Sequence, residues 1–408
     1  MTTSVPPEHP RFPNGISLYV HVPFCLSKCP YCDFNTYQGI EEMKAPYVDA
    51  LVREVRLWGG LLDHPRLNTI FFGGGTPSYM AAGQVEAIMD AVRASFPLGV
   101  DAEVTLESNP GDVTSAFLES MLSLGMNRLS IGVQALDDSL LQMLGRRHTA
   151  DQAREALQLS RSAGCSNINV DLMYGLPNQT LDQWERSLGS ALDLAPEHLS
   201  LYCLTLEEGT PLKRWVDEGS LPTPDPDLCA DMYGHARSAM KGAGYVHYEI
   251  SNWAVPGRHS VHNMAYWENG PYLGVGPGAH SSLDGRRFWD VTSPRQYIQR
   301  SRQWEPEAYL SVGGMAWELL SEQGPLGGSE TIDNRTEMAE TMVLGLRLLE
   351  GLDPEGFRKR FGRLPVEVYG DQVAQLVRDG LLEEDGGKLK LTEASLFLSN
   401  QVFMRFLD

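Results

Sequence analysis

The chain has 408 residues, which exceeds one typical domain and predicts two or three. Hydrophobic residues make up 42% of it, and no apolar run reaches the ~20 residues of a membrane-spanning helix, so we expect a globular protein with a sizeable core. Aspartate and glutamate (53) outnumber lysine and arginine (33), and the net charge of -20 argues against nucleic acid as a partner, because phosphate backbones repel such a chain.

The first residues, 1–16, are polar and rich in proline and do not resemble a secretory signal peptide. The whole chain contains six cysteines, too few and too scattered for a disulfide framework. We therefore expect a cytoplasmic protein with free thiols, in which residues 1–16 form an N-terminal extension.

Three cysteines, Cys25, Cys29 and Cys32, lie within eight residues after a strand expected over 17–21. Their spacing is C-x3-C-x2-C, and the proline and aspartate that follow two of them do not continue a helix, so the thiols are expected on a loop. Three converging thiolates leave one ligand position open, as in a catalytic zinc site or an iron–sulfur cluster with one uncapped iron. The spacing alone also allows a structural zinc site completed by His21 or by a distant histidine.

Beyond this loop, short apolar strands alternate with amphipathic helices. The further strands are expected over 68–72, 102–107, 129–134, 168–173, 198–205 and 245–250. The helices are expected over 47–58, 85–92, 117–124, 135–163 (more than one), 181–192 and 228–241. Such alternation requires right-handed crossovers and a parallel sheet covered by helices. Because polar or glycine-rich segments recur where strands end, we predict an α/β fold with a partial (β/α)6-type barrel rather than an open doubly wound sheet.

The C-terminal part has a different character. From Leu344 onward we expect short helices, GLRLLEGL and VYGDQVAQLVRDGLL, and then a hairpin, LLEEDGGKLKLT, with its turn at 385–387. This order is typical of a winged-helix-like α+β module, but the acidic local sequence lacks a basic recognition face, so we expect a docking or lid role. The expected domains are the extension (1–16), the barrel (17–252), a connecting region (253–330) and the winged-helix-like domain (331–408).

Polar residues occur where the expected strands end. The GGGTP segment at 73–77 follows a strand, and its backbone amides can face a carboxylate or an amine, although an ordinary tight turn would look the same. Glu107, Gln134 and Asp171 lie in or at the ends of three expected strands, and a polar group that points into a barrel costs free energy unless it has a partner. Together they indicate a shared ligand. Arg146 would supply a counter-charge, or it simply marks a solvated helix end.

The cysteine loop, the GGGTP turn and the strand-end polar residues resemble those of radical S-adenosylmethionine proteins. More narrowly, the chain resembles the family of oxygen-independent coproporphyrinogen III oxidase and the heme chaperone HemW, through YVHVPFC, FFGGGTPS, ESNPGD, GVQ, DLMYGLPNQT and YEISNWA. The resemblance implies that Cys25, Cys29 and Cys32 bind three irons of a 4Fe-4S cluster and leave the fourth iron to S-adenosylmethionine. It implies an S-adenosylmethionine pocket formed by Tyr19, Tyr31, Gly75, Thr76, Pro77, Glu107, Gln134, Arg146 and Asp171.

Two features separate the branches of this family. The oxidase carries a further cysteine two residues after the third, where this chain has Phe34, and HNMAYW at 262–267 matches the HNxxYW signature of the HemW type. Imidazole is a natural axial ligand for heme iron, and Tyr266 and Trp267 offer flat surfaces for a macrocycle. His262 is therefore the candidate heme ligand within a heme-associated region, although a histidine beside aromatic residues is usually just packed.

The resemblance favours a protein that binds heme and delivers it to hemoproteins, with a 4Fe-4S cluster and S-adenosylmethionine as cofactors. Its expected partners are an electron donor to the cluster and respiratory hemoproteins, met at the cytoplasmic face of the membrane. The alternative is an enzyme that decarboxylates coproporphyrinogen III oxidatively to protoporphyrinogen IX, against which Phe34 and HNxxYW argue. A zinc-stabilised binding protein would leave the strand-end polar residues unexplained.

Overall fold

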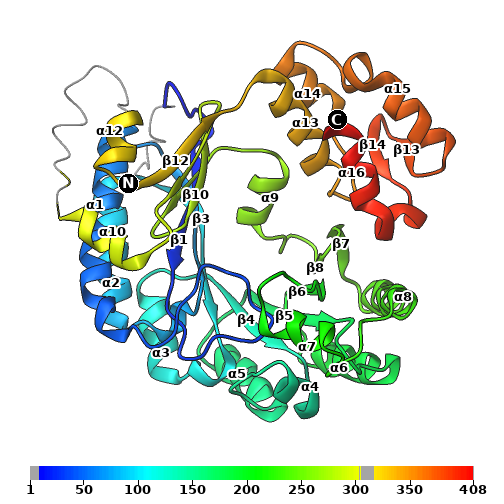
Figure 1. The fold of residues 1–408 in the computed structure, drawn as a ribbon, viewed down its shortest axis with the longest axis horizontal. Coiled ribbons are helices and arrows are strands. Elements are labelled where there is room, and N and C mark those ends of the chain that lie inside the picture. Colours follow the sequence, from blue (N-terminus) through cyan, green and yellow to red (C-terminus); the bar gives the residue numbers. More distant parts are fainter. Residues whose placement is uncertain (1–8, 303, 305–316, 408) are drawn as a thin grey trace. The chain divides into compact units, whose positions relative to one another are not determined.

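The computed structural model describes residues 9–302, 304 and 317–407, which form two compact units (Figure 1). The first unit comprises the described residues of Met1–Asn169, Thr205–Leu221 and Pro271–Glu330. The second comprises those of Val170–Leu204, Pro222–Gly270 and Thr331–Asp408. Each unit thus draws on three separate stretches of the chain.

The first unit is built on a mixed sheet with the strand order β12-β11-β10-β9-β1-β2-β3-β4. In chain order its strands are β1 (Ile16–Val22), β2 (Leu67–Gly74), β3 (Leu98–Ser108), β4 (Arg128–Gln134), β9 (Tyr272–Val275), β10 (His280–Leu283), β11 (Arg286–Asp290) and β12 (Leu326–Thr331). Strand β1 pairs in parallel with β2 and β9, and β2, β3 and β4 continue the parallel series, whereas β10 runs antiparallel to β9 and β11. The parallel arrangement brings the carboxyl ends of β1 to β4 to one edge.

Helices and short 3-10 turns surround this sheet. The helices are α1 (Lys44–Leu61), α2 (Ala82–Ser95), α3 (Ser115–Ser123), α4 (Asp138–Met143), α5 (Ala150–Ser162), α7 (Pro211–Asp217), α10 (Pro294–Ser301) and α12 (Trp317–Glu322), and the 3-10 turns are η1 (Glu41–Met43), η2 (Pro77–Tyr79) and η3 (Pro110–Asp112). Helix α1 contacts both α2 and α10, which lies far away in the sequence (Figure 1). Its predicted apolar stripe is buried, including Val48, Leu51 and Val55. Helix α5 begins with a capping box between Thr149 and Gln152.

The second unit contributes strands in the order β5-β6-β8-β7. Its strands are β5 (Ile168–Tyr174), β6 (His198–Cys203), β7 (Val246–Glu249) and β8 (Asn252–Ala254), and its helices before the C-terminal part are α6 (Leu181–Asp193), α8 (Pro226–Gly242) and α9 (Val261–Trp267). Trp184 and Trp253 are buried in its core, and the Trp184 indole N–H donates a hydrogen bond to the Met232 carbonyl (2.8 Å). This hydrogen bond therefore links α6 to α8.

The C-terminal part of the second unit contains three helices, a hairpin and a last helix. These elements are α13 (Asn334–Gly345), α14 (Pro354–Phe361), α15 (Pro365–Arg378), β13 (Leu382–Asp385), β14 (Lys388–Leu391), η4 (Glu393–Leu398) and α16 (Ser399–Leu407). The predicted hairpin is confirmed: Asp385 pairs with Lys388 across Gly386 and Gly387, which both have positive φ.

One local expectation was wrong. The segment GLRLLEGL is not a helix: α13 ends at Gly345, and the residues after it form antiparallel bridges, Leu348 with Glu249 and Leu352 with Leu389. Pairing with distant residues outweighs the local pattern here. The stretch after residue 253 contains strands β9 to β11. No helix among the described residues has the length and apolar content needed to cross a membrane.

Candidate functional site

The cysteine loop follows β1 and is closed at its base by backbone hydrogen bonds. The Cys25 N–H donates to the Tyr37 carbonyl (2.9 Å), and the Tyr37 N–H donates to the Pro23 carbonyl (2.8 Å). Inside the loop, the Lys28 ammonium group donates to the Phe34 carbonyl (2.9 Å). The loop is thus held by its own polar groups, which is how a segment with few apolar side chains keeps one conformation.

The three cysteines of the loop are free, half-exposed thiols. Each sulfur atom lies within hydrogen-bonding distance of a polar side chain: Cys25 of Thr76 (3.6 Å), Cys29 of Arg146 (3.5 Å) and Cys32 of Thr36 (4.0 Å). Burial raises the pKa of the Cys25 and Cys32 thiols. Hydrogen bonds of this kind orient metal ligands, so the donor set fits three thiolates that each bind one iron of a cluster.

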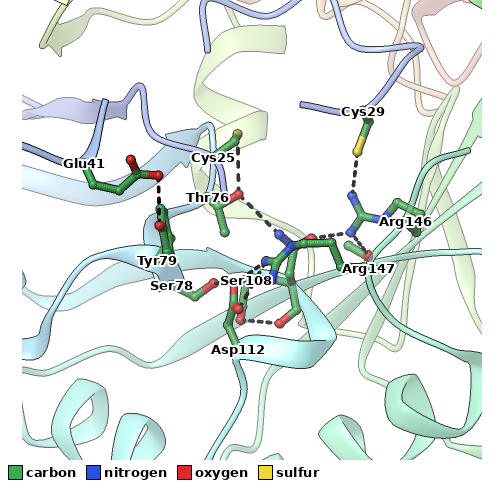
Figure 2. Close-up of polar contacts among 12 residues, drawn as sticks. Cys25, Cys29, Glu41, Thr76, Ser78, Tyr79, Ser108, Asp112, Arg146 and Arg147 are labelled. Atoms are coloured by element: carbon green, nitrogen blue, oxygen red, sulfur yellow. Dashed lines mark hydrogen bonds and ion pairs between the residues drawn. The ribbon is translucent and has the colours of Figure 1, made fainter. Parts of the chain in front are cut away.

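A chain of hydrogen bonds connects two of these cysteines beneath the loop (Figure 2). Thr76 donates its hydroxyl to Cys25 and accepts from the Asn109 amide (3.3 Å). The Asn109 side-chain oxygen in turn accepts from Arg146, whose other guanidinium nitrogen reaches Cys29. The sequence analysis did not single out Asn109, although it stands within the ESNPGD motif directly after a strand.

The turns that follow β2 and β3 are joined by further polar contacts (Figure 2). The Ser78 hydroxyl donates to Asp112 (3.0 Å) and accepts from the Asn109 backbone N–H (3.3 Å). Arg147 forms an ion pair with the same Asp112 carboxylate (3.1 Å). These contacts fix Asn109 relative to Thr76 and so stabilise the hydrogen-bond chain between the cysteines.

The glycine turn after β2 packs tightly against the strand that leads into the cysteine loop. The Gly75 N–H donates to the Val22 carbonyl (2.7 Å), and the Thr76 N–H donates to the Phe24 carbonyl (2.8 Å). A Cβ atom on Gly75 would lie 2.7 Å from both of these carbonyl oxygens. Gly74 has a φ of 102°, a conformation that side chains with a Cβ rarely adopt. The turn therefore requires glycine at these positions for steric reasons.

Two of the predicted S-adenosylmethionine residues, Tyr19 and Glu107, lie beside this turn. Glu107 accepts a hydrogen bond from the Gly74 N–H (3.2 Å), and a Cβ atom on Gly73 would lie 3.0 Å from the Glu107 carboxylate and 3.1 Å from the Tyr19 ring. Gln134 ends β4 in the left-handed region, with a φ of 66°.

The remaining predicted residues extend the same site or lie elsewhere in the fold. Tyr31 contacts Cys29 and Arg146, and burial raises the pKa of its hydroxyl. Pro77 is buried at the start of η2, directly after Thr76. Asp171 lies in β5 of the second unit, so its place in this pocket stays a prediction.

His21 does not serve as a fourth ligand in this structure. Its Nδ1 lies 3.0 Å from the Tyr19 hydroxyl and its Nε2 lies 2.9 Å from the Asn35 carbonyl, so both ring nitrogens already have partners. Among the described residues, no group of three or more histidine, cysteine, aspartate or glutamate side chains is placed to hold a single metal ion. Cysteines around a cluster each bind a different iron, so a 4Fe-4S cluster does not require such a group.

The second unit contains a cavity of about 420 Å³, within the usual range of small-molecule sites. Its wall includes residues of β7, of α9 and of the segment around α13 and α14. Met264 and Trp267 of the HNxxYW helix line it, as does His259 just before that helix. His262 is buried, with 1% of its surface exposed, and its Nε2 lies 2.9 Å from the Tyr266 hydroxyl.

Comparison with known proteins agrees with this fold. Residues 19–191 match the model of the Radical SAM superfamily, and residues 332–398 match that of the HemN C-terminal domain. "Heme chaperone HemW" of Lactococcus lactis subsp. lactis (strain IL1403) is 32% identical over 391 residues, covering 96% of this chain and 97% of the relative. "Radical S-adenosyl methionine domain-containing protein 1, mitochondrial" of Mus musculus is 37% identical over 407 residues, covering 98% and 89%.

A solved structure supports the same fold. It is described as "Coproporphyrinogen III oxidase (HemN) from Escherichia coli is a Radical SAM enzyme", and it superimposes with a TM-score of 0.81 at 23% identity, covering 98% of this chain and 92% of that one. The predicted α/β radical SAM fold with a C-terminal domain is therefore confirmed. Within that superfamily, the chain belongs to the family of the heme chaperone HemW.

Proposed function

We propose that this chain is a heme chaperone that carries a 4Fe-4S cluster and S-adenosylmethionine in its first unit and binds heme as cargo. The observation that carries the proposal is the combination of full-length similarity to relatives named "Heme chaperone HemW" with a ligand-sized cavity lined by the HNxxYW helix. Heme would then be delivered to hemoproteins, and respiratory proteins at the membrane are the proposed recipients.

The cofactor site would use the residues of the first unit in distinct ways. Cys25, Cys29 and Cys32 would each bind one iron, and the bound cluster and S-adenosylmethionine would supply one-electron reductive chemistry. Thr76 and Arg146 donate hydrogen bonds to two of the sulfur atoms and would lower the electron density on them. The remaining predicted residues of the pocket, including Asp171, would bind S-adenosylmethionine.

The alternative activity, oxidation of coproporphyrinogen III, is less well supported by the residues of the loop. Phe34 occupies the position of the oxidase's further cysteine, and its side chain is 62% exposed. The similarity to the solved oxidase shows the fold alone at 23% identity. The proposal therefore assigns no catalytic residue.

The test uses the full chain, reconstituted anaerobically with iron and sulfide. It should bind hemin with a shift of the Soret band and pass it to a heme-depleted respiratory hemoprotein, whose activity then returns. A sample without hemin is the control. Failure to bind hemin would contradict the proposal, and protoporphyrinogen IX formation from coproporphyrinogen III at enzymatic rates would replace it with the alternative.

A further inference from the structure

Two cysteines of the second unit lie next to each other, outside both the cysteine loop and the cavity. Cys203 is the last residue of β6, and Cys229 lies near the start of α8. A Cβ atom on Gly175 would lie 2.6 Å from the Cys229 sulfur and 3.3 Å from the Cys203 sulfur, so both thiols approach one point beside this glycine. The two thiols are hydrogen-bonded to each other.

The turn after β5 leaves the space in which these thiols meet. Gly175 directly follows β5 and has a φ of 70°, a conformation that residues with a Cβ rarely adopt. The Leu204 N–H donates to the Tyr174 carbonyl (2.9 Å), which fixes the end of β6 beside the end of β5. The buried Tyr174 hydroxyl contacts the Cys203 thiol. The backbone therefore holds Cys203 in place, and a side chain at position 175 would collide with the sulfur of Cys229.

The two thiols differ in acidity. The hydrogen bond from Cys203 lowers the pKa of Cys229, although burial and the Asp225 carboxylate act in the opposite direction. The same hydrogen bond, together with burial, raises the pKa of Cys203. The thiolate is the nucleophile in exchange with disulfides, and a neighbouring thiol that keeps its proton can react second. Cys229 thus has the properties of the attacking cysteine and Cys203 those of the resolving one.

Both sulfur atoms belong to residues that solvent reaches. Cys203 is exposed and Cys229 is partly exposed, so a small molecule can approach the pair. Cys165 offers a contrast within the same chain, because it is buried and burial raises the pKa of its thiol. Reactive cysteines are accessible and have a stabilised thiolate, whereas buried cysteines are inert. The pair of Cys203 and Cys229 meets these conditions, and Cys165 does not.

We propose that Cys203 and Cys229 form a thiol–disulfide exchange site that takes a low-molecular-weight disulfide and becomes a reversible intramolecular disulfide. The Cys229 thiolate would attack one sulfur of the small disulfide, expel one small thiolate and form a mixed disulfide. Cys203 would then lose its proton and attack the Cys229 sulfur, which expels the second small thiolate. The two protons of the protein thiols pass to the released thiols, so one disulfide bond breaks and one forms. The site needs neither heme nor the cluster, and it goes beyond the proposed function.

The test exposes the reduced full chain, without air, to oxidised glutathione. Remaining thiols are then blocked with iodoacetamide, and disulfides are mapped by mass spectrometry after tryptic digestion. Cys203 and Cys229 fall in different tryptic peptides, residues 187–213 and 215–237, which contain one cysteine each. We expect these two peptides to be cross-linked, and dithiothreitol to separate them again. A wild-type chain that forms only mixed disulfides with glutathione, or no disulfide between these peptides, would overturn the proposal.

Single variants test the order of the two steps. Cys203→Ser should form no cross-link and should accumulate glutathione at Cys229, because the resolving thiol is missing while a hydroxyl donor remains. Cys229→Ala should take up glutathione at Cys203 more slowly, by about fivefold or more. Cys165→Ser is the matched control, and it should form the cross-link between the two peptides as the wild type does. Equal uptake by Cys203→Ser and Cys229→Ala would overturn the assignment of Cys229 as the attacking cysteine.

Discussion

Replacing Gly75 with alanine should disrupt the cysteine loop from a position outside it. The added Cβ atom would lie 2.7 Å from the carbonyl oxygens of Val22 and Phe24, well short of the 3.4 Å at which ordinary contact begins. Both neighbours are backbone atoms of the segment that enters the loop, so no side chain can rotate away. The turn and the segment must separate.

The expected loss of stability follows from the contacts between the glycine turn and the segment that enters the loop. Overpacking of this kind costs about 1–3 kcal/mol. The two hydrogen bonds at 2.7 and 2.8 Å between the glycine turn and this segment would also be stretched. Each contributes about 0.5–1.5 kcal/mol, so the total loss of stability lies between about 2 and about 6 kcal/mol. The Thr76 hydroxyl would move with the turn and lose its contact with Cys25.

The assay measures denaturant unfolding of the cofactor-free chain under anaerobic conditions and iron content after reconstitution. Gly75→Ala should lower both the unfolding midpoint and the iron content. Gly83→Ala is the matched control, because a Cβ at this exposed position of α2 meets nothing within 4 Å, and it should leave iron content unchanged and raise stability by up to about 1 kcal/mol. A Gly75→Ala variant with the wild-type midpoint and full iron would refute the steric argument.

Three further predictions concern the first unit. Alanine at any one cysteine of the loop should abolish the broad absorbance of a reconstituted 4Fe-4S cluster, whereas Cys165→Ala should not; retained iron in the loop variants would contradict the ligand assignment. Asn109→Leu should break the hydrogen-bond chain between Cys25 and Cys29 and so shift the midpoint potential of the cluster, measured by redox titration. Ser108→Ala, at the neighbouring position, should leave the potential unchanged. Equal potentials in the two variants would exclude an influence of Asn109 on the cluster. Burial lowers the pKa of His148 in the folded chain to about 4, whereas in the unfolded chain it stays near 6.5. As the pH falls from about 6.5 to about 4, the unfolded chain therefore takes up a proton that the folded chain does not, and the free energy of unfolding decreases. Between pH 7.5 and pH 4.5, His148→Gln should lose up to about 3 kcal/mol less free energy of unfolding than the wild type. The same pH dependence in the variant and the wild type would show that another group is responsible.

The local sequence pattern was enough to predict several parts of the fold and of the site. The apolar stripe of α1 and the Gly386–Gly387 hairpin each depend on residues within a few positions of one another, so the sequence alone predicts them. The same is true of the cysteine loop, whose spacing and following proline indicate converging thiols. The radical SAM family followed from these motifs in their order.

Other features depend on residues that meet only in three dimensions. The segment after Gly345 has a helical pattern, yet it bridges to strands more than thirty residues away. Asn109 acquires its role because Thr76, after β2, and Arg146, after α4, both approach it.

The HNxxYW segment shows the same division most clearly. The sequence by itself determined that the HNxxYW segment belongs to a heme-related family, and it made His262 the natural choice, because the motif places that residue among aromatic side chains. Only the tertiary structure decided that His262 is buried with its Nε2 2.9 Å from the Tyr266 hydroxyl, while Met264 and Trp267 of the same helix line the cavity. The reason is physical: which nitrogen stays available to a ligand depends on the whole hydrogen-bond network around it, and that network is set by packing between distant segments.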